Sequence, residues 1–216
     1  MPNSIAIVKT QGDPLRVRAT ANGQPIDLLP NGTLVYVTGN PVTSGGLTWS
    51  QIGVNRWVAT KFLAPHSASV GKAKVVATRT PDTLGGGLRV YKTELLDNNN
   101  QLIQTVRGIS GRVGKQTPSH VAGSATPLPF GIYTFDLPGS VDESAAGEFG
   151  NAWSAVTPTF NTERSGLGIH YDPSALKQDA NTGTAGCFAT PTKAERDVMT
   201  KFIRAYKPLY FMVLPG

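Results

Sequence analysis

The sequence predicts a mainly β protein made of a small barrel and then a larger β-rich domain with one main helix near the C-terminus. Its 216 residues include 24 glycines and 16 prolines, a composition typical of short strands joined by turns. Short alternating or β-branched runs recur along the chain, and only one segment has the period of an amphipathic helix. Residues 64–74 are small, polar and interrupted by Pro and Gly, which predicts a linker. We therefore expect domains at 1–66 and 67–216.

The first domain is expected to be all-β. Turn signals at Pro30-Asn-Gly32 and Gly53-Val-Asn55 separate short apolar runs. Trp49 and Trp57 either fill the small core or contact a ligand, and for Trp57 the core is favoured because large aromatic residues dominate small cores. The predicted strands of this domain are 15–18, 33–37, 48–52 and 56–59.

The second domain is expected to open with strands at 74–78 and 87–91. An Asn-rich turn within 95–106 predicts a hairpin. Two long loops follow, 115–125 and 136–152. The second is either a lid over a site or plain surface.

The helix is expected within 190–206, with Thr192 as its cap. Thr192 followed by Glu195 is a capping-box signature, and Pro208 ends the helix. Residues 209–214 form an apolar strand that we expect to be buried. The apolar stripe of the helix is interpreted as core packing and consists of Val198, Met199, Phe202, Ile203 and Tyr206.

Charge and composition exclude several classes. The net charge is +6, but no run of five Lys or Arg residues indicates a nucleic-acid tract. No apolar run is long enough to span a membrane. No cysteine pair or His-x-x-x-His motif supports a metal site, and we expect no cofactor. Residues 1–9 lack a signal-peptide pattern. The expected location is therefore the cell wall, periplasm or exterior by another route, or otherwise the cytoplasm.

The candidate catalytic residues are Cys187 and His170, which sixteen residues separate. Cys187 is the only cysteine, and it lies in Gly183-Thr-Ala-Gly-Cys187, which we expect to be a loop. An imidazole can generate the thiolate nucleophile. The alternative is a buried thiol that only packs. Small neighbours favour catalysis, because substrate and the backbone N–H groups of Gly186 and Cys187 can approach the sulfur.

Two resemblances follow from these motifs. Residues 5–64 keep the order Leu-x-Val-Arg, Leu-Pro-Asn-Gly-Thr-x-Val, Trp-x-x-Ile and Trp-Val, which resembles a bacterial SH3-like domain. Residues 74–214 resemble the L,D-transpeptidase (YkuD-like) catalytic domain. They carry Ser110-Gly-Arg-Val-Gly, Thr126-Pro-Leu-Pro-Phe-Gly-Ile-Tyr, Gly168-Ile-His170 and Thr184-Ala-Gly-Cys187 in that order.

The resemblance implies a cysteine-dependent L,D-transpeptidase that acts on peptidoglycan stem peptides through an acyl thioester. His170 matches the usual base. Two positions depart from the family pattern, since Ala185 replaces a histidine and Ala189 an arginine or asparagine.

Other residues near the motif are expected to bind substrate. Thr184 orients the segment around Cys187, and Tyr171 lies beside His170. Asp172 either bonds His170 or turns the chain before Pro173. Arg164 either meets a substrate carboxylate or lies on the surface.

Two alternative functions stay open. One is a peptidoglycan hydrolase, such as a lysin or a toxin-like L,D-peptidase, on the same scaffold. The other is a wall-binding protein whose catalytic domain has lapsed. The oligomeric state does not follow from the sequence.

Overall fold

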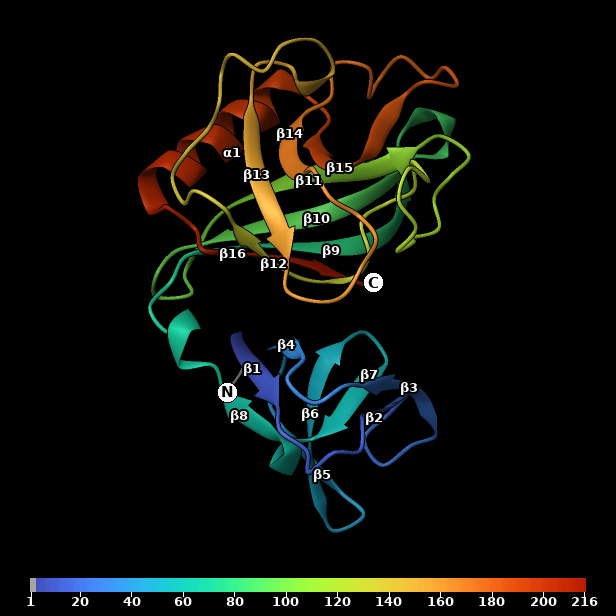
Figure 1. The fold of residues 1–216 in the computed structure, drawn as a ribbon, viewed down its shortest axis with the longest axis vertical. Helices are drawn as coiled ribbons and strands as arrows, with labels where there is room; N and C mark the ends of the chain where they lie inside the picture. The colour runs from blue at the N-terminus through green and yellow to red at the C-terminus, as the bar shows by residue number, and fades with distance from the viewer. Residues whose placement is uncertain (1–2) are drawn as a thin grey trace. The chain divides into compact units, whose positions relative to one another are not determined.

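A computed structural model describes residues 3–216, which fall into two compact units that divide after Val70 (Figure 1). Most regular structure in both is strand, and residues 3–216 contain one α-helix. The prediction of a mainly β protein with one main helix near the C-terminus is confirmed.

The N-terminal unit holds eight short strands in two sheets, ordered β4-β1-β8 and β3-β2-β7-β6-β5. The alternation of Leu15 and Val17 with Arg16 and Arg18 places the apolar pair inside and the arginines outside. Its strands are β1 (Ser4–Val8), β2 (Leu15–Arg18), β3 (Pro25–Leu29), β4 (Leu34–Val37), β5 (Val42–Ser44), β6 (Leu47–Gly53), β7 (Arg56–Ala59) and β8 (Leu63–Pro65).

The two tryptophans of this unit differ. Trp49 is buried, and its Nε1 donates to the Ser44 carbonyl at 3.0 Å, whereas Trp57 is half-buried. The main core cluster is aliphatic and consists of Ala6, Val8, Leu15, Val17, Val35, Val37, Ile52 and Val58. Small β-branched side chains therefore supply most of this core.

The predicted linker at 64–74 is partly wrong. Ala64 and Pro65 belong to β8, which pairs with β1 through Ile7↔Ala64 and Ala6↔Pro65. A 3-10 turn, η2 (Ser67–Ser69), follows, and the next strand begins at Lys74. The Pro and Gly content of this segment predicted a linker, although its first residues form the edge strand β8.

The C-terminal unit is a closed barrel in the order β10-β11-β15-β14-β13-β12-β16-β9. The β14–β15 and β16–β9 pairs are parallel, and the other neighbours are antiparallel. Its elements are β9 (Lys74–Thr83), η3 (Gly85–Gly87), β10 (Arg89–Leu96), β11 (Leu102–Arg112), β12 (Gly131–Phe135), η4 (Gly147–Phe149), β13 (Trp153–Pro158), β14 (Leu167–Tyr171), β15 (Gly183–Thr190), α1 (Lys193–Tyr206) and β16 (Tyr210–Leu214).

Helix α1 begins as the sequence predicts. Thr192 is the N-cap, and its Oγ1 accepts from the backbone N–H of Glu195 at 3.3 Å. Lys207 ends the helix in the left-handed region, just before Pro208. All five residues of the predicted stripe pack into the core of the unit, which confirms the packing interpretation.

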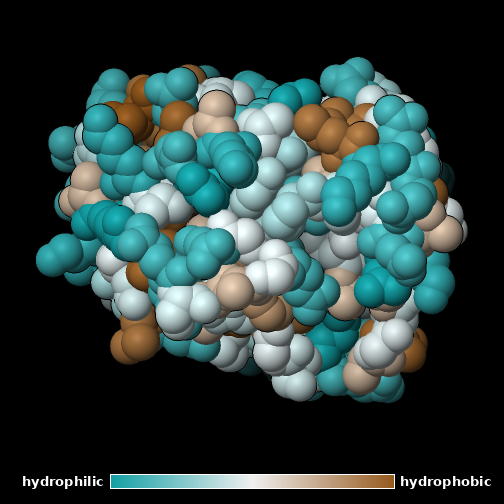
Figure 2. Space-filling view, turned by 90° about the horizontal axis from the view of Figure 1, so that it is seen from above, coloured by the Kyte–Doolittle hydropathy of each residue, from teal (hydrophilic) through white to brown (hydrophobic). Residues whose placement is uncertain are grey.

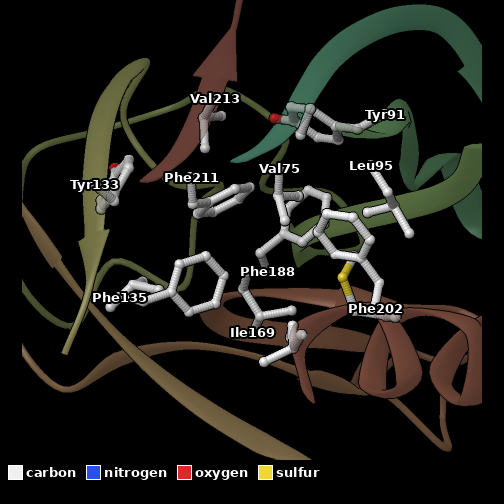
Figure 3. Close-up of a cluster of buried hydrophobic side chains, with 14 of the residues drawn as sticks. Val75, Tyr91, Leu95, Tyr133, Phe135, Ile169, Phe188, Phe202, Phe211 and Val213 are labelled. Carbon is white, nitrogen blue, oxygen red and sulfur yellow. The ribbon is translucent and has the colours of Figure 1, made fainter. Parts of the chain in front are cut away.

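Aromatic rings fill the centre of the barrel core. Phe188 and Phe211 lie with ring centroids 5.0 Å apart, and Ile169 and Phe202 lie near them beside the helix (Figure 3). On the face drawn in Figure 2, hydrophobic residues occur in small separate groups among hydrophilic ones. That face therefore offers no single continuous apolar patch.

Candidate active site

Cys187 and His170 lie on neighbouring parallel strands, β15 and β14. The register pairs Ile169 with Phe188 and His170 with Ala189. Because side chains alternate along a strand and Ile169 and Phe188 point into the core, Cys187 and His170 share the outer face. The thiol and the imidazole are therefore diagonal neighbours on one side of the sheet, a separation that long side chains can bridge.

The segment that we expected to be a loop around Cys187 is a strand. It pairs with β11 on one side, through Ile109↔Ala189 and Ser110↔Phe188, and with β14 on the other. The sequence did not indicate a strand because glycine is uncommon in strand interiors. A strand fixes the backbone of the nucleophile more firmly than a loop would.

Burial favours the neutral form of the Cys187 thiol. Its Sγ lies 3.8 Å from the carbonyl oxygen of Gly166. Burial raises the pKa of the Cys187 thiol above its ordinary value, while the Gly168 N–H and the Arg164 charge act in the opposite direction. Glu148 adds a smaller raising effect.

Burial also favours the neutral form of the His170 imidazole. The residue is 5% exposed, and burial lowers the pKa of its ring. The Tyr171 carbonyl, the Asp172 charge, and the charge and backbone carbonyl of Glu148 have smaller raising effects. Nδ1 lies 3.0 Å from the Tyr171 carbonyl oxygen, which can only accept, so Nδ1 carries the proton. Nε2 therefore holds the lone pair that a general base needs.

Within residues 3–216 no hydrogen bond joins the Cys187 thiol to the His170 ring. The thiol is directed to Gly166 instead. Direct proton transfer therefore requires the thiol hydrogen to point at the imidazole and not at the Gly166 carbonyl. Catalytic hydrogen bonds commonly tighten only when substrate binds.

The pKa directions predict how Cys187 reacts with iodoacetamide. We expect the alkylation rate to rise roughly tenfold per pH unit from pH 6 to 9, since only the thiolate reacts and the thiol pKa is raised. The same protein unfolded in urea should react faster at each pH, because its thiol recovers the ordinary pKa. A rate plateau at neutral pH would contradict this and indicate a preformed thiolate–imidazolium pair.

Two aromatic residues that the sequence analysis missed enclose His170. The Trp153 ring stacks on the imidazole with a centroid-to-centroid distance of 6.0 Å. The Phe149 ring contacts the imidazole edge-on, with centroids 5.3 Å apart. Trp153 also lies over Gly168, where a Cβ would clash with its ring. Trp153 is paired with His170 in the register of β13 and β14. A prediction that residues 153–158 form a strand beside β14 would therefore have identified Trp153 as a neighbour of His170.

The loop 136–152 covers this site. Its short turn η4 carries Phe149 onto His170, and its Glu148 charge influences both the thiol and the imidazole. Of the two interpretations left open by the sequence, the structure matches a cover rather than plain surface.

Two hydroxyl groups hold the backbone at Cys187. The carbonyl of Cys187 accepts from Thr184 Oγ1 at 2.7 Å and from Ser110 Oγ at 2.8 Å. Thr184 Oγ1 also accepts from the N–H groups of Gly111 and Gly186, at 3.0 and 3.2 Å. The expected orienting effect of Thr184 thus has a physical basis. The Gly186 N–H is occupied, so it can stabilise an oxyanion only by leaving Thr184.

Arg164 is neither a surface residue nor a free cation. It is 7% exposed. Its Nη2 donates to the Gly186 carbonyl at 2.7 Å, while Nη1 contacts three carbonyls of the 119–127 loop, at 2.9–3.3 Å. The structure therefore matches neither the expected contact with a substrate carboxylate nor a surface position. The guanidinium ties the segment around Cys187 to a neighbouring loop and brings a positive charge near the sulfur.

Tyr171 and Asp172 are not grouped with the thiol. Alternation places Tyr171 on the opposite face of the sheet, where Arg196 of α1 lies 5.6 Å from its ring centre. Asp172 Oδ1 accepts from the N–H and hydroxyl of Ser174, both at 2.7 Å. Of the two interpretations of Asp172, the structure matches the turn, although its charge still raises the pKa of His170.

The alanines at the two departing positions differ in environment. Ala185 is exposed, whereas Ala189 is fully buried in an apolar cluster with Leu88, Ile109 and Ala175. A cation at Ala189 would be desolvated in that cluster. Among the described residues no group of three or more His, Cys, Asp or Glu is arranged to hold a metal ion.

No family model, curated protein or solved structure matches the chain significantly. In the part of the chain that the structure describes, no helix has the length and apolar character needed to cross a membrane.

Proposed function

We propose that the C-terminal unit is a cysteine acyltransferase of the L,D-transpeptidase (YkuD-like) type, acting on peptidoglycan stem peptides. The observation that carries the proposal is that Cys187 and His170 share the outer face of adjacent strands. Around them the backbone of the nucleophile is fixed by Ser110 and Thr184. The substrate class and the family come from the sequence resemblance.

The proposed reaction has two steps. Nε2 of His170 takes the thiol proton, and the sulfur attacks the carbonyl carbon of an amide beside a D-residue. The amide C–N bond breaks, His170 returns the proton to the leaving amine, and an acyl thioester remains on Cys187. Attack by an amine then forms a new amide cross-link and releases the thiol.

The resemblance also suggests a task for the N-terminal unit. As an SH3-like domain it would hold the enzyme on the cell wall. This proposal places the protein in the wall, periplasm or exterior.

A covalent adduct tests this function. We expect intact-mass spectrometry to show an adduct on Cys187 after incubation with a carbapenem or a stem tetrapeptide. Cys187→Ser should show none while keeping the wild-type circular dichroism spectrum. A folded wild-type protein that forms no adduct with either reagent would contradict the proposal and favour a lapsed, wall-binding protein.

Hydrolysis is the second candidate, and the alanines favour it. With Ala185 exposed and Ala189 buried among apolar residues, neither position offers a charged or imidazole group to hold an acceptor amine. Water would then release the acyl group as a carboxylate. Muropeptide analysis of treated sacculi separates the two outcomes, because transfer produces new cross-links and hydrolysis produces shortened stems.

A further inference from the structure

A groove of about 1050 Å³ lies in the N-terminal unit, and its lining shares no residue with the site built around Cys187. The loop between β1 and β2, the outer face of β2 and the turn η1 (Thr60–Phe62) contribute to its walls. Four cationic side chains line it, and one acidic side chain, Asp13, accompanies them. The cations are Lys9, Arg16, Arg18 and Lys61.

The positive charge of the groove is not neutralised within the unit. None of the four cations forms an ion pair in the described part of the chain. The unit contains one other acidic residue, Asp27, and its carboxylate is bound by Arg56 at 2.5 Å outside the groove lining. A concave surface with four cations and one carboxylate has an excess of positive charge, which concentrates anionic ligands.

A cation lies near each of the two aromatic rings of the groove. The Arg18 guanidinium lies 5.4 Å from the ring centre of Trp49, which is itself 3% exposed. The Lys61 ammonium lies 4.9 Å from the ring centre of Phe62. Nucleobases and sugar rings are bound by stacking on free aromatic faces, so this groove favours anions over stacked rings.

The two arginines of the groove follow the direction of strand β2. Arg16 and Arg18 are two residues apart on the outer face of β2, which spaces their Cα atoms by roughly 6.6 Å. Arg18 is held in place, since its Nη1 donates to the Gly23 carbonyl at 2.5 Å. Guanidinium groups match phosphate oxygens in two parallel hydrogen bonds, which compact ammonium groups cannot do.

We propose that this groove binds a linear phosphodiester polymer without aromatic groups, such as a chain of polyol phosphates. Successive phosphates lie along β2, where Arg16 and Arg18 bind them. Lys9 and Lys61 add charge at the sides. This binding needs neither Cys187 nor His170. The proposal can therefore be tested separately from the proposed catalysis.

Titration of the full-length protein with poly(glycerol phosphate) tests the proposal. We expect saturable binding whose affinity falls about 50-fold between 50 and 200 mM salt, the counterion effect of four contacts. Arg16→Gln and Lys61→Gln should each weaken binding about 3- to 10-fold and reduce the salt slope by about one. Lys72→Gln, an exposed change of the same charge outside the groove, should bind like wild type.

The comparison polymers give the outcomes that would overturn it. Polyglutamate, a single-stranded oligonucleotide and an uncharged glycan chain of similar length should all bind more weakly. Equal or tighter binding of polyglutamate or of the glycan would show that the groove does not select phosphodiesters. Equal or tighter binding of the oligonucleotide would show that the groove does not favour phosphodiesters that lack aromatic bases. An equal loss of affinity in Arg16→Gln and Lys72→Gln would show an effect of net charge alone.

Discussion

Replacing His170 with alanine is expected to slow acylation of Cys187 by about 10²- to 10⁴-fold, the usual contribution of a general base. The neutral thiol is a poor nucleophile, since burial raises its pKa, so it depends on a group that takes its proton. His170 is the ionisable side chain that shares its face on the adjacent strand, and Nδ1 is already bonded to the Tyr171 carbonyl. The lone pair of the neutral ring is therefore on Nε2.

Single-turnover acylation by a carbapenem, followed by intact mass, measures this effect. His120→Ala is the matched control, because His120 is exposed on the 115–125 loop. The loss of a ring between Trp153 and Phe149 can loosen their packing, so a thermal melt must accompany the rates. Partial recovery of the rate with added imidazole would identify the missing group as a base. Wild-type acylation by folded His170→Ala would remove His170 from the mechanism.

The predictable parts of this structure are those whose causes are local. Helix α1 was predicted because Thr192 supplies its cap and its apolar residues recur at helical spacing. The hairpin of β10 and β11 was predicted from the Asn-rich turn between them. In both cases the signal lies within a few residues of the feature.

The site depends on pairings that the sequence does not display. Cys187 and His170 share a face only because β14 and β15 are parallel in one particular register, and a shift by one residue would place them on opposite faces. Trp153 reaches His170 through a third strand that local patterning did not reveal. The composition indicated which groups are chemically able to react, and the strand register of the barrel determined which of them lie on the same face.

Arg164 shows the limit most clearly. A single arginine in a polar segment is normally exposed, because desolvating a guanidinium is costly. Here four backbone carbonyls from two separate segments offset that cost. No local sequence pattern predicts that those four carbonyls all face the Arg164 guanidinium.

Arg164→Gln is accordingly expected to destabilise the C-terminal unit by about 3–4 kcal/mol. Buried carbonyls that lose a charged donor keep their desolvation cost, and glutamine cannot span both segments. Because Cys187 is the only thiol, its labelling as a function of urea concentration reports unfolding of this unit. Arg56→Gln, which breaks an ion pair with an exposed Asp27 in the other unit, should leave that curve unchanged.

Arg164→Lys separates the two effects of the guanidinium. Lysine keeps the positive charge that lowers the thiol pKa but cannot replace the planar fork that joins Gly186 to the 119–127 loop. We expect it to lose much of the stability while iodoacetamide reactivity keeps a nearly wild-type pH dependence. In Arg164→Gln that dependence should move to higher pH, since a cation near the sulfur has been removed. Unchanged stability and pH dependence in both variants would show that Arg164 neither fixes the strand nor favours the thiolate.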